Sequence, residues 1–131
     1  MTTGSKELLP YTDVVNYQSR LYVRVLPSQQ SLEECLRHGF KPSNIICMQG
    51  PFSEGLNIAM LKQTDARYLV TKETGRSGGF DEKLSAAAKC NVKVIVIGRP
   101  SQEEGLSVKE ACNYLKKVLG VVEEEDNRYS I

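Results

Sequence analysis

Apolar and polar residues follow two regular patterns that alternate along the chain. Four short stretches, rich in branched and aromatic side chains, lie between longer segments in which apolar residues recur every three or four positions. The short stretches predict β-strands and the longer segments predict helices. The expected strands are Arg20–Leu26, Asn44–Met48, Tyr68–Thr71 and Val92–Ile97.

Serine residues mark where the expected helices begin. Ser31 with Glu34, and Ser107 with Glu110, have the spacing of a capping box, and Ser53 is placed to cap a further helix. The stripes expected to face inward are Leu32, Cys35 and Leu36; Leu56, Ala59 and Met60; Leu84, Ala87 and Ala88 within residues 79–90; and Val108, Ala111, Cys112, Leu115 and Leu119.

Strands that alternate with helices are typical of β-α-β units, whose strands pair in parallel. The sequence therefore predicts an α/β fold, a Rossmann-like three-layer domain with a mainly parallel sheet of about four to five strands. Residues 1–19 show no sustained period and contain Pro10, which favours an arm or interdomain linker. Residues 20–120 are expected to form the domain, and residues 121–131 an acidic polar tail.

Composition and charge exclude several classes of protein. A chain of 131 residues and 14.6 kDa is long enough for one domain. No apolar run reaches the roughly 18 residues of a spanning helix, and the first residues lack a secretory signal, so we expect a cytoplasmic protein without a membrane partner. The net charge of +1 argues against a nucleic-acid partner. Because the tail is acidic, the rest of the chain is mildly basic, which suits an anionic small molecule.

Cysteine and histidine content argues against a metal site. The four cysteines stand far apart and the chain has one histidine, whereas metal ligands usually occur in spaced pairs. Cys35 and Cys112 fall at apolar helical positions and Cys47 lies in an expected strand, so we interpret them as buried, reduced thiols.

Three connections follow expected strands and therefore lie at the edge where parallel sheets bind ligands. The connection from Thr71 to Gly79 carries Lys72, Arg76 and several glycines, which suits an anion cradle for carboxylate or phosphate, although a flexible, solvated loop would have a similar composition. The connection that follows the last expected strand places Arg99 at the rim of such a site.

The remaining connection, Gly50-Pro51-Phe52-Ser53, has two interpretations. It is either a turn followed by a helix cap, or one wall of a pocket in which the Phe52 ring contacts a flat ligand. The sequence lacks G-x-G-x-x-G, Walker and G-x-S-x-G motifs. Residue chemistry alone therefore predicts an anion-binding α/β domain.

Five segments form an ordered series: VRVLPS at 23–28, GFKPSNIICMQGPFS at 39–53, LVTKETG at 69–75, Gly78-Gly79, and VIVIGRP at 94–100. Together they resemble the precorrin-6A reductase family of cobalamin biosynthesis. The similarity is to the C-terminal half of that family. One departure is that Glu73 and Thr74 stand where the family usually has Asp and Ser.

The resemblance implies hydride transfer from NADPH to the macrocycle of precorrin-6A or of its cobalt form. The family builds its site in a cleft between two Rossmann-like domains, so the resemblance implies a missing N-terminal cofactor-binding domain and little or no activity of this chain alone. We hypothesise that Lys72 is the first candidate for the proton donor. The residues expected to bind substrate or cofactor are Gly50, Pro51, Phe52, Ser53, Thr71, Thr74, Gly75, Arg76, Gly78, Gly79 and Arg99.

Two other classes of protein are compatible with parallel α/β architecture. One is a free-standing anion- or nucleotide-binding module without catalysis. The other is a phospho-receiver-like signalling domain, which needs acidic residues after the first strand and at a strand end. Pro27-Ser28 and Gln49-Gly50 occupy those places, which argues against it.

Overall fold

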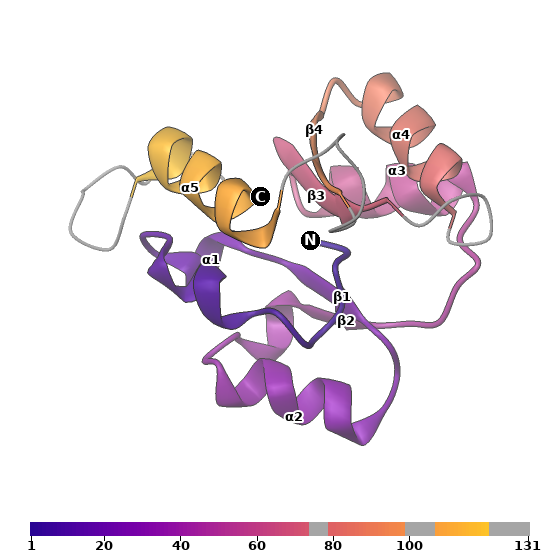
Figure 1. Cartoon of the computed structure of the whole chain (residues 1–131). Helices are drawn as coiled ribbons and strands as arrows, with labels where there is room; N and C mark the ends of the chain where they lie inside the picture. The colour runs from indigo at the N-terminus through magenta and orange to yellow at the C-terminus, as the bar shows by residue number, and fades with distance from the viewer. Residues whose placement is uncertain (74–78, 99–106, 121–131) are drawn as a thin grey trace.

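The computed structural model describes residues 1–73, 79–98 and 107–120, and Figure 1 shows their arrangement. Helices and strands alternate after an N-terminal segment, as the periodicity predicts. In chain order the elements are η1 (Leu9–Asp13), α1 (Tyr17–Arg20), β1 (Val23–Val25), α2 (Gln29–Arg37), η2 (Pro42–Asn44), β2 (Ile45–Cys47), α3 (Glu54–Gln63), β3 (Tyr68–Lys72), α4 (Phe80–Lys89), β4 (Lys93–Ile97) and α5 (Val108–Leu119).

The strands form two parallel pairs. β1 pairs with β2 in the register Val23 to Ile45, and β3 pairs with β4 in the register Tyr68 to Lys93. Since each strand is followed by a helix before its partner, both pairs are β-α-β units. The α/β class and the parallel pairing are confirmed, although each hydrogen-bonded sheet holds two strands and not the expected four to five.

The first residues of the chain connect the two pairs. The Met1 nitrogen donates to the Tyr22 carbonyl at 2.6 Å, and the Arg24 amide donates to the Met1 carbonyl at 2.8 Å. On the other side the Thr2 amide donates to the Val70 carbonyl at 2.9 Å. The N-terminal segment therefore lies between β1 and β3 and links the pairs through backbone hydrogen bonds.

This placement corrects the expectation that residues 1–19 form an arm. Leu8, Tyr11 and Val14 are almost completely buried and belong to the larger hydrophobic cluster. Helical or strand periodicity gave no signal here because η1 and α1 are single turns and the bridging segment is shorter than a strand. The segment is part of the folded body.

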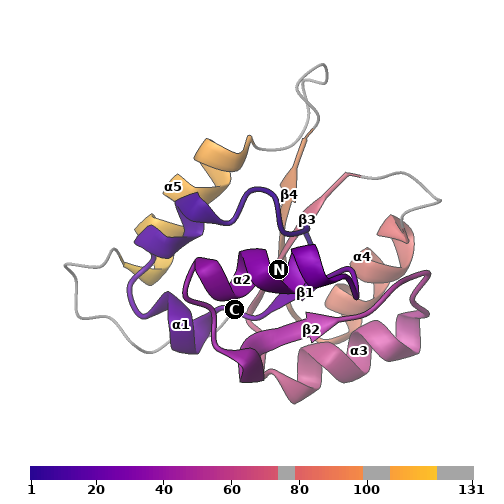
Figure 2. The same ribbon diagram turned by 90° about the horizontal axis from the view of Figure 1, so that it is seen from below.

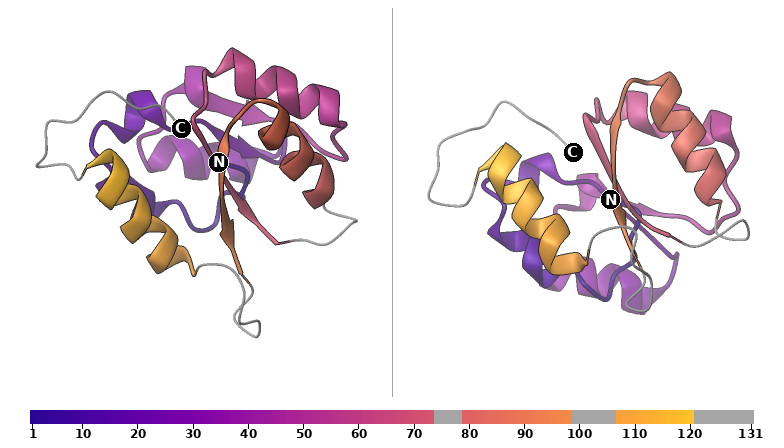
Figure 3. Two further views of the ribbon diagram at one scale, coloured as in Figure 1. Left: turned by 90° about the horizontal axis from the view of Figure 1, so that it is seen from above. Right: turned by 45° about the horizontal axis from the view of Figure 1, so that its top comes forward.

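Helices cover both faces of the strands, which gives three layers. In Figure 2, α2 and α3 lie on opposite sides of the β1–β2 pair, and in Figure 3, α5 and α4 lie on opposite sides of the β3–β4 pair. Two hydrophobic clusters fill the two interfaces. The larger includes Val23, Val25, Val70, Ile95 and Leu115, and the smaller includes Leu61, Leu69, Ala86, Ala87 and Val92.

Two of the three helix caps predicted from the sequence are found in the structure. Ser53 caps α3 and Ser107 caps α5, each accepting a hydrogen bond from the backbone amide three residues later. At α2 the prediction is wrong, because Ser28 caps the helix and accepts from the Ser31 amide at 3.1 Å. Both serines fit the sequence preference for a cap, and the helix begins at the earlier one.

The buried face of α2 also differs from the prediction. Ser31 and Cys35 face the strands, whereas Leu32 and Leu36, expected inside, are 38% and 45% exposed. Similar shifts occur in α3 and α4, where Ala59 and Ala88 are exposed. Polar side chains take the inward positions there, and these side chains build the site described below.

The buried face of α5 matches the prediction at Ala111, Cys112, Leu115 and Leu119. All four cysteines are free, and burial raises the pKa of the Cys35 and Cys112 thiols to about 11. Both are therefore neutral, unreactive thiols, as expected. The acidic tail lies outside the described residues.

Candidate functional site

A pocket of about 370 Å³ opens at the carboxyl ends of β1 and β2. Its walls come from the residues that follow these strands, from the N-terminal segment, and from α4. Gly50 and Pro51, joined by a cis peptide bond, line it together with Phe52. The ligand-binding edge expected from parallel strands is therefore hollowed at the Gly50–Phe52 connection.

Arg24 supplies the first cation of this pocket. Its neighbours Val23 and Val25 point into the larger cluster, so strand alternation turns Arg24 to the opposite face, towards α3. The side chain is 8% exposed, and the guanidinium carbon lies 3.9 Å from the centroid of the Phe52 ring. Burial lowers the pKa of Arg24 to about 10, which leaves it charged at neutral pH.

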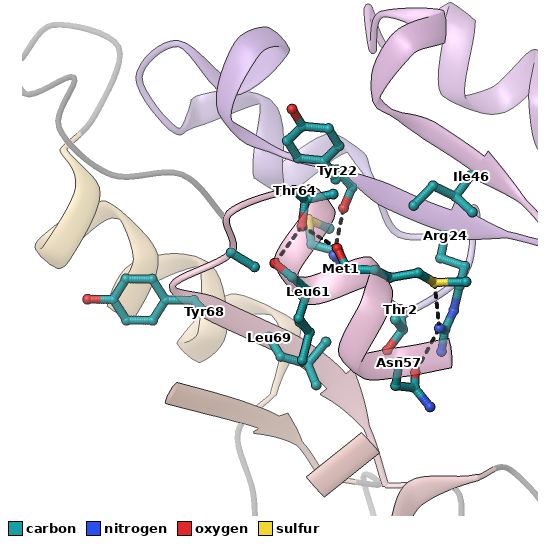
Figure 4. A pocket seen from close by; sticks show the side chains of 12 residues that line it. Met1, Thr2, Tyr22, Arg24, Ile46, Asn57, Leu61, Thr64, Tyr68 and Leu69 are labelled. Carbon is teal, nitrogen blue, oxygen red and sulfur yellow. Dashed lines mark hydrogen bonds between the residues drawn. The ribbon is translucent and has the colours of Figure 1, made fainter. Parts of the chain in front are cut away.

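Residues of α3 hold the Arg24 guanidinium in place, and Figure 4 shows one of them, Asn57. Arg24 donates to Asn57 Oδ1 at 2.9 Å and contacts Met60 Sδ at 3.3 Å. Asn57 itself donates from Nδ2 to the Ser53 carbonyl at 2.9 Å and is 5% exposed. This chain of hydrogen bonds fixes the guanidinium against the Phe52 ring and makes Asn57 a positioning residue.

Lys83 supplies the second cation. It lies on the inward face of α4, in line with Ala86 and Ala87, and is 6% exposed. Its Nζ donates to Thr71 Oγ1 at 3.3 Å. Burial, and then the charge of Arg24, lower the pKa of Lys83 to about 8, so the ammonium is protonated at neutral pH.

Arg24 and Lys83 are paired with no carboxylate of residues 1–73, 79–98 and 107–120. Two buried positive charges without a counterion are costly to the folded chain, since each loses hydration and both repel. An anion in the pocket would relieve both penalties. A fork-shaped guanidinium next to an aromatic ring suits a carboxylate attached to a flat, apolar body.

Gly50 is sterically tied to Phe52. A Cβ at position 50 would lie 3.1 Å from the Phe52 ring, so a side chain there would fit only if the ring shifted by a few tenths of an ångström relative to Arg24. The Gly50-Pro51-Phe52 connection thus acts as a pocket wall, and Ser53 caps α3 beside it. The connection therefore combines a helix cap with a pocket wall, and contact of the Phe52 ring with a flat ligand stays a prediction.

The structure separates Lys72 and Thr71 from this pocket. Lys72 lies at the end of β3, where its Nζ forms an ion pair with Glu7 at 3.0 Å and lines a neighbouring pocket. Thr71 was expected to contact a ligand. Its side chain is instead completely buried and accepts a hydrogen bond from Lys83.

The other expected site residues lie around the start of α4 or beyond the described part. Gly79 is buried with a φ of +72°, which favours glycine, and caps α4. Thr74, Gly75, Arg76, Gly78 and Arg99 lie outside the described residues.

Sequence patterns did not single out Arg24 and Lys83 as site residues, although each position carries a signal of burial. An arginine in the middle of a strand covered on both faces must be buried, and the expected helices on both sides of the sheet implied this for Arg24. Lys83 lies three and four residues before Ala86 and Ala87, which is the spacing of one helix face.

The described residues contain no candidate for a metal cluster or a membrane-spanning helix. No group of three or more His, Cys, Asp or Glu side chains is placed to hold a metal ion in this part of the chain. None of its helices is long and apolar enough to cross a membrane.

Curated relatives are similar to most of this chain. A cobalt-precorrin-6A reductase of Methanothermobacter thermautotrophicus is 48% identical over 81 residues, which is 62% of this chain and 27% of the relative. The enzyme of the same name from Priestia megaterium is 40% identical over 112 residues, or 80% of this chain and 42% of the relative. That from Methanococcus maripaludis is 38% identical over 120 residues, or 88% and 46%.

The chain thus spans less than half the length of these relatives. No solved structure shows significant similarity to it. The family model described as precorrin-6x reductase CbiJ/CobK matches residues 1–116, which include both pairs of strands and the pocket with Arg24, Phe52 and Lys83. The resemblance seen in the sequence is confirmed, and the chain belongs to the precorrin-6x reductase CbiJ/CobK family.

Proposed function

We propose that this chain is the C-terminal half of an NADPH-dependent oxidoreductase that reduces precorrin-6A or its cobalt form in cobalamin biosynthesis. The observation that carries the proposal is the pocket beside the Phe52 ring, in which Arg24 and Lys83 are buried and have no carboxylate partner among the described residues. The family, and relatives named cobalt-precorrin-6A reductase, supply the reaction class.

The substrate of this reaction is a flat macrocycle rimmed with carboxylates, and the pocket has a group for each of these properties. Arg24, oriented by Asn57, would bind one rim carboxylate, and the Phe52 ring would contact the edge of the macrocycle. Lys83 would neutralise further negative charge of the bound macrocycle. These contacts fix the position of the ring for reduction.

NADPH supplies the hydride when it is bound, and the protein supplies orientation and electrostatics. The two unpaired cations fit an anionic ligand, which both the phosphates of this cofactor and the carboxylates of the substrate provide. The N-terminal half of the relatives would complete the cleft, since the chain has no dinucleotide fingerprint.

Two lysines are candidates for the proton donor that accompanies the hydride. Lys72, the candidate from the sequence, is held by Glu7 at the end of β3. Lys83 releases a proton more easily because its pKa is about 8, and it already lines the Phe52 pocket. In the complete enzyme, Lys72→Met and Lys83→Met separate these roles, since only the donor's replacement removes the basic limb of the pH–rate profile.

The proposal is tested by assembling the enzyme from its halves. This chain, with NADPH and precorrin-6A or its cobalt form, is expected to show no NADPH oxidation. The same chain joined to the N-terminal half of the Priestia megaterium relative is expected to restore it. Turnover by the chain alone would contradict the assignment as half an enzyme, and a joined enzyme with a correct fold and no turnover would contradict the reductase assignment.

A further inference from the structure

Apolar side chains are exposed at the mouth of the pocket that contains Phe52. Leu26 is 58% exposed and Met48 is 39% exposed, and both line this pocket together with Pro51 and Phe52. Single apolar side chains on a surface are common, but several that gather at one pocket indicate a contact surface. We call Leu26, Met48, Pro51 and Phe52 the apolar rim.

Backbone pairing places Leu26 and Met48 side by side. The Met48 amide donates to the Val25 carbonyl at 3.0 Å, which continues the β1–β2 pairing beyond the register of Val25 with Cys47. Leu26 lies two residues after Arg24, so strand alternation puts both side chains on the same face of the sheet. The ends of two paired strands therefore hold the apolar rim next to the cation.

The apolar rim differs in polarity from the inner part of the pocket. Arg24 and Lys83 are 8% and 6% exposed, so the two cations lie deeper than the exposed apolar side chains. A matching ligand has an anionic group at its inner end and an apolar surface at its outer end. A carboxylate arm attached to an apolar ring has this order of groups, whereas an apolar protein surface laid over the rim would leave both cations without an anion.

The volume of the pocket limits how much of a ligand can enter. About 370 Å³ lies near the lower end of the roughly 300–1,000 Å³ that pockets for drug-sized ligands have. A tetrapyrrole macrocycle with its carboxylate arms is larger than a drug-sized molecule, so the pocket can hold only part of it. One arm can reach the cations while the macrocycle stays at the mouth of the pocket, against the apolar rim.

We propose, on the basis of the function proposed above, that one carboxylate arm of the substrate enters this pocket while the macrocycle lies on the apolar rim. Leu26 and Met48 are then specificity-determining residues, because they contact the macrocycle while Arg24 and Lys83 bind the arm. Burial of these two side chains against the macrocycle adds affinity that a carboxylate alone does not have. The pocket therefore selects a carboxylate on a large apolar ring over a small carboxylate.

Two ligands separate the contact with the macrocycle from the contact with its arm. Cobyrinic acid is a corrin with several carboxylate arms, and propionate has the carboxylate without the ring. Each is titrated into the full chain while leucine and methionine methyl groups and backbone amides are followed by NMR. Cobyrinic acid is expected to shift the Leu26 and Met48 methyl resonances saturably and to give intermolecular NOEs to them. Propionate is expected to shift the Gly50 and Phe52 amides and to leave those methyl resonances unchanged.

Substitutions in the apolar rim test its contribution to affinity. Leu26→Gln and Met48→Gln keep the approximate size but make the rim polar, and each should weaken cobyrinic acid binding about three- to tenfold without changing the affinity for propionate. Leu26→Met and Met48→Leu keep an apolar side chain and should retain the affinity for both ligands. Leu36→Gln is the matched control, because Leu36 is 45% exposed on α2 and does not line the pocket, and it should change neither affinity.

Unchanged affinity for cobyrinic acid in both glutamine variants, or an equal loss of affinity for both ligands, would overturn the proposal. Methyl shifts of Leu26 and Met48 that appear only when the N-terminal half is joined to the chain would also overturn it, since the rim would then be a contact between the halves. Arg24→Met tests the proposed function separately and should weaken both ligands. If Arg24→Met weakens binding while the glutamine variants do not, the rim proposal fails and the anion site of the proposed function stands. Unchanged binding by Arg24→Met would contradict the proposed function.

Discussion

At the scale of single residues, the fold buries two positive charges at an energetic cost. Among the described residues, Arg24 is held by Asn57, and Lys83 donates to the neutral hydroxyl of Thr71. A group that destabilises the folded chain and is still present is typical of a binding site, where the ligand supplies the missing interaction. The sequence left open whether the Gly50–Phe52 connection forms a wall. It did not place the two charges, because Arg24 is buried by the covering of both faces of β1 and Lys83 by the inward face of α4.

The energetic cost of burying the Lys83 ammonium can be measured from the pH dependence of the free energy of unfolding. Its pKa of about 8 lies below the ordinary value of 10.5, so the folded state binds fewer protons than the unfolded state between these pH values. This group therefore reduces stability fully below about pH 8, and the penalty disappears as the pH rises towards 10.5. We expect Lys83→Met to raise the free energy of unfolding at pH 7 by about 1 kcal/mol or more.

Urea unfolding at pH 7 and pH 10 measures this difference, which should shrink at the higher pH. Lys62→Met is the control, because Lys62 is an exposed lysine of the neighbouring helix and should show no comparable change. A destabilised Lys83→Met at pH 7 without ligand would show that the ammonium is well satisfied in the folded chain.

At the scale of elements, local patterns located the strands and most helix ends, because these depend on nearby residues. The cores of all four expected strands and the caps Ser53 and Ser107 are found in the structure. The buried face of α2 was predicted wrongly, because Leu32 and Leu36 are exposed while Ser31 and Cys35 are buried. Apolar spacing fits a helix face, but tertiary packing decides which face is buried.

Cap replacements distinguish the two serines. Ser28→Ala removes the acceptor of the Ser31 amide and should lower the free energy of unfolding by about 1 kcal/mol. Ser107→Ala should cost a similar amount, since Ser107 has the same role at α5. Chemical denaturation measures both. If Ser28→Ala leaves stability unchanged while Ser31→Ala lowers it, the helix begins at the later serine.

At the scale of the whole molecule, the chain start holds the two strand pairs together. Met1 and Thr2 make backbone hydrogen bonds to Tyr22, Arg24 and Val70, and Thr2 and Gly4 line the pocket between the pairs. Sequence patterns could not show this, because a segment of two residues has no period. The same segment that joins the strands therefore also shapes the ligand-binding edge.

The link is tested at Thr2. Thr2→Pro removes the amide that donates to the Val70 carbonyl and should lower the free energy of unfolding by about 1–3 kcal/mol. Thr2→Val keeps the amide and the branched shape, and it should retain most of the stability. Hydrogen exchange then locates the effect, with faster exchange expected in β1 and β3. Equal stability of the two variants would show that the strand pairs do not depend on this bond.

The most direct test of the central claim is calorimetric titration of this chain with cobyrinic acid, a corrin with a rim of carboxylates. We expect saturable binding that weakens as the pH rises above about 8, because Lys83 takes up a proton when the anion binds. Lys83→Met and Arg24→Met should each weaken it at least about tenfold, and Lys62→Met should not. Binding of equal strength in all four proteins, or no binding by the correctly folded wild-type chain, would contradict the account.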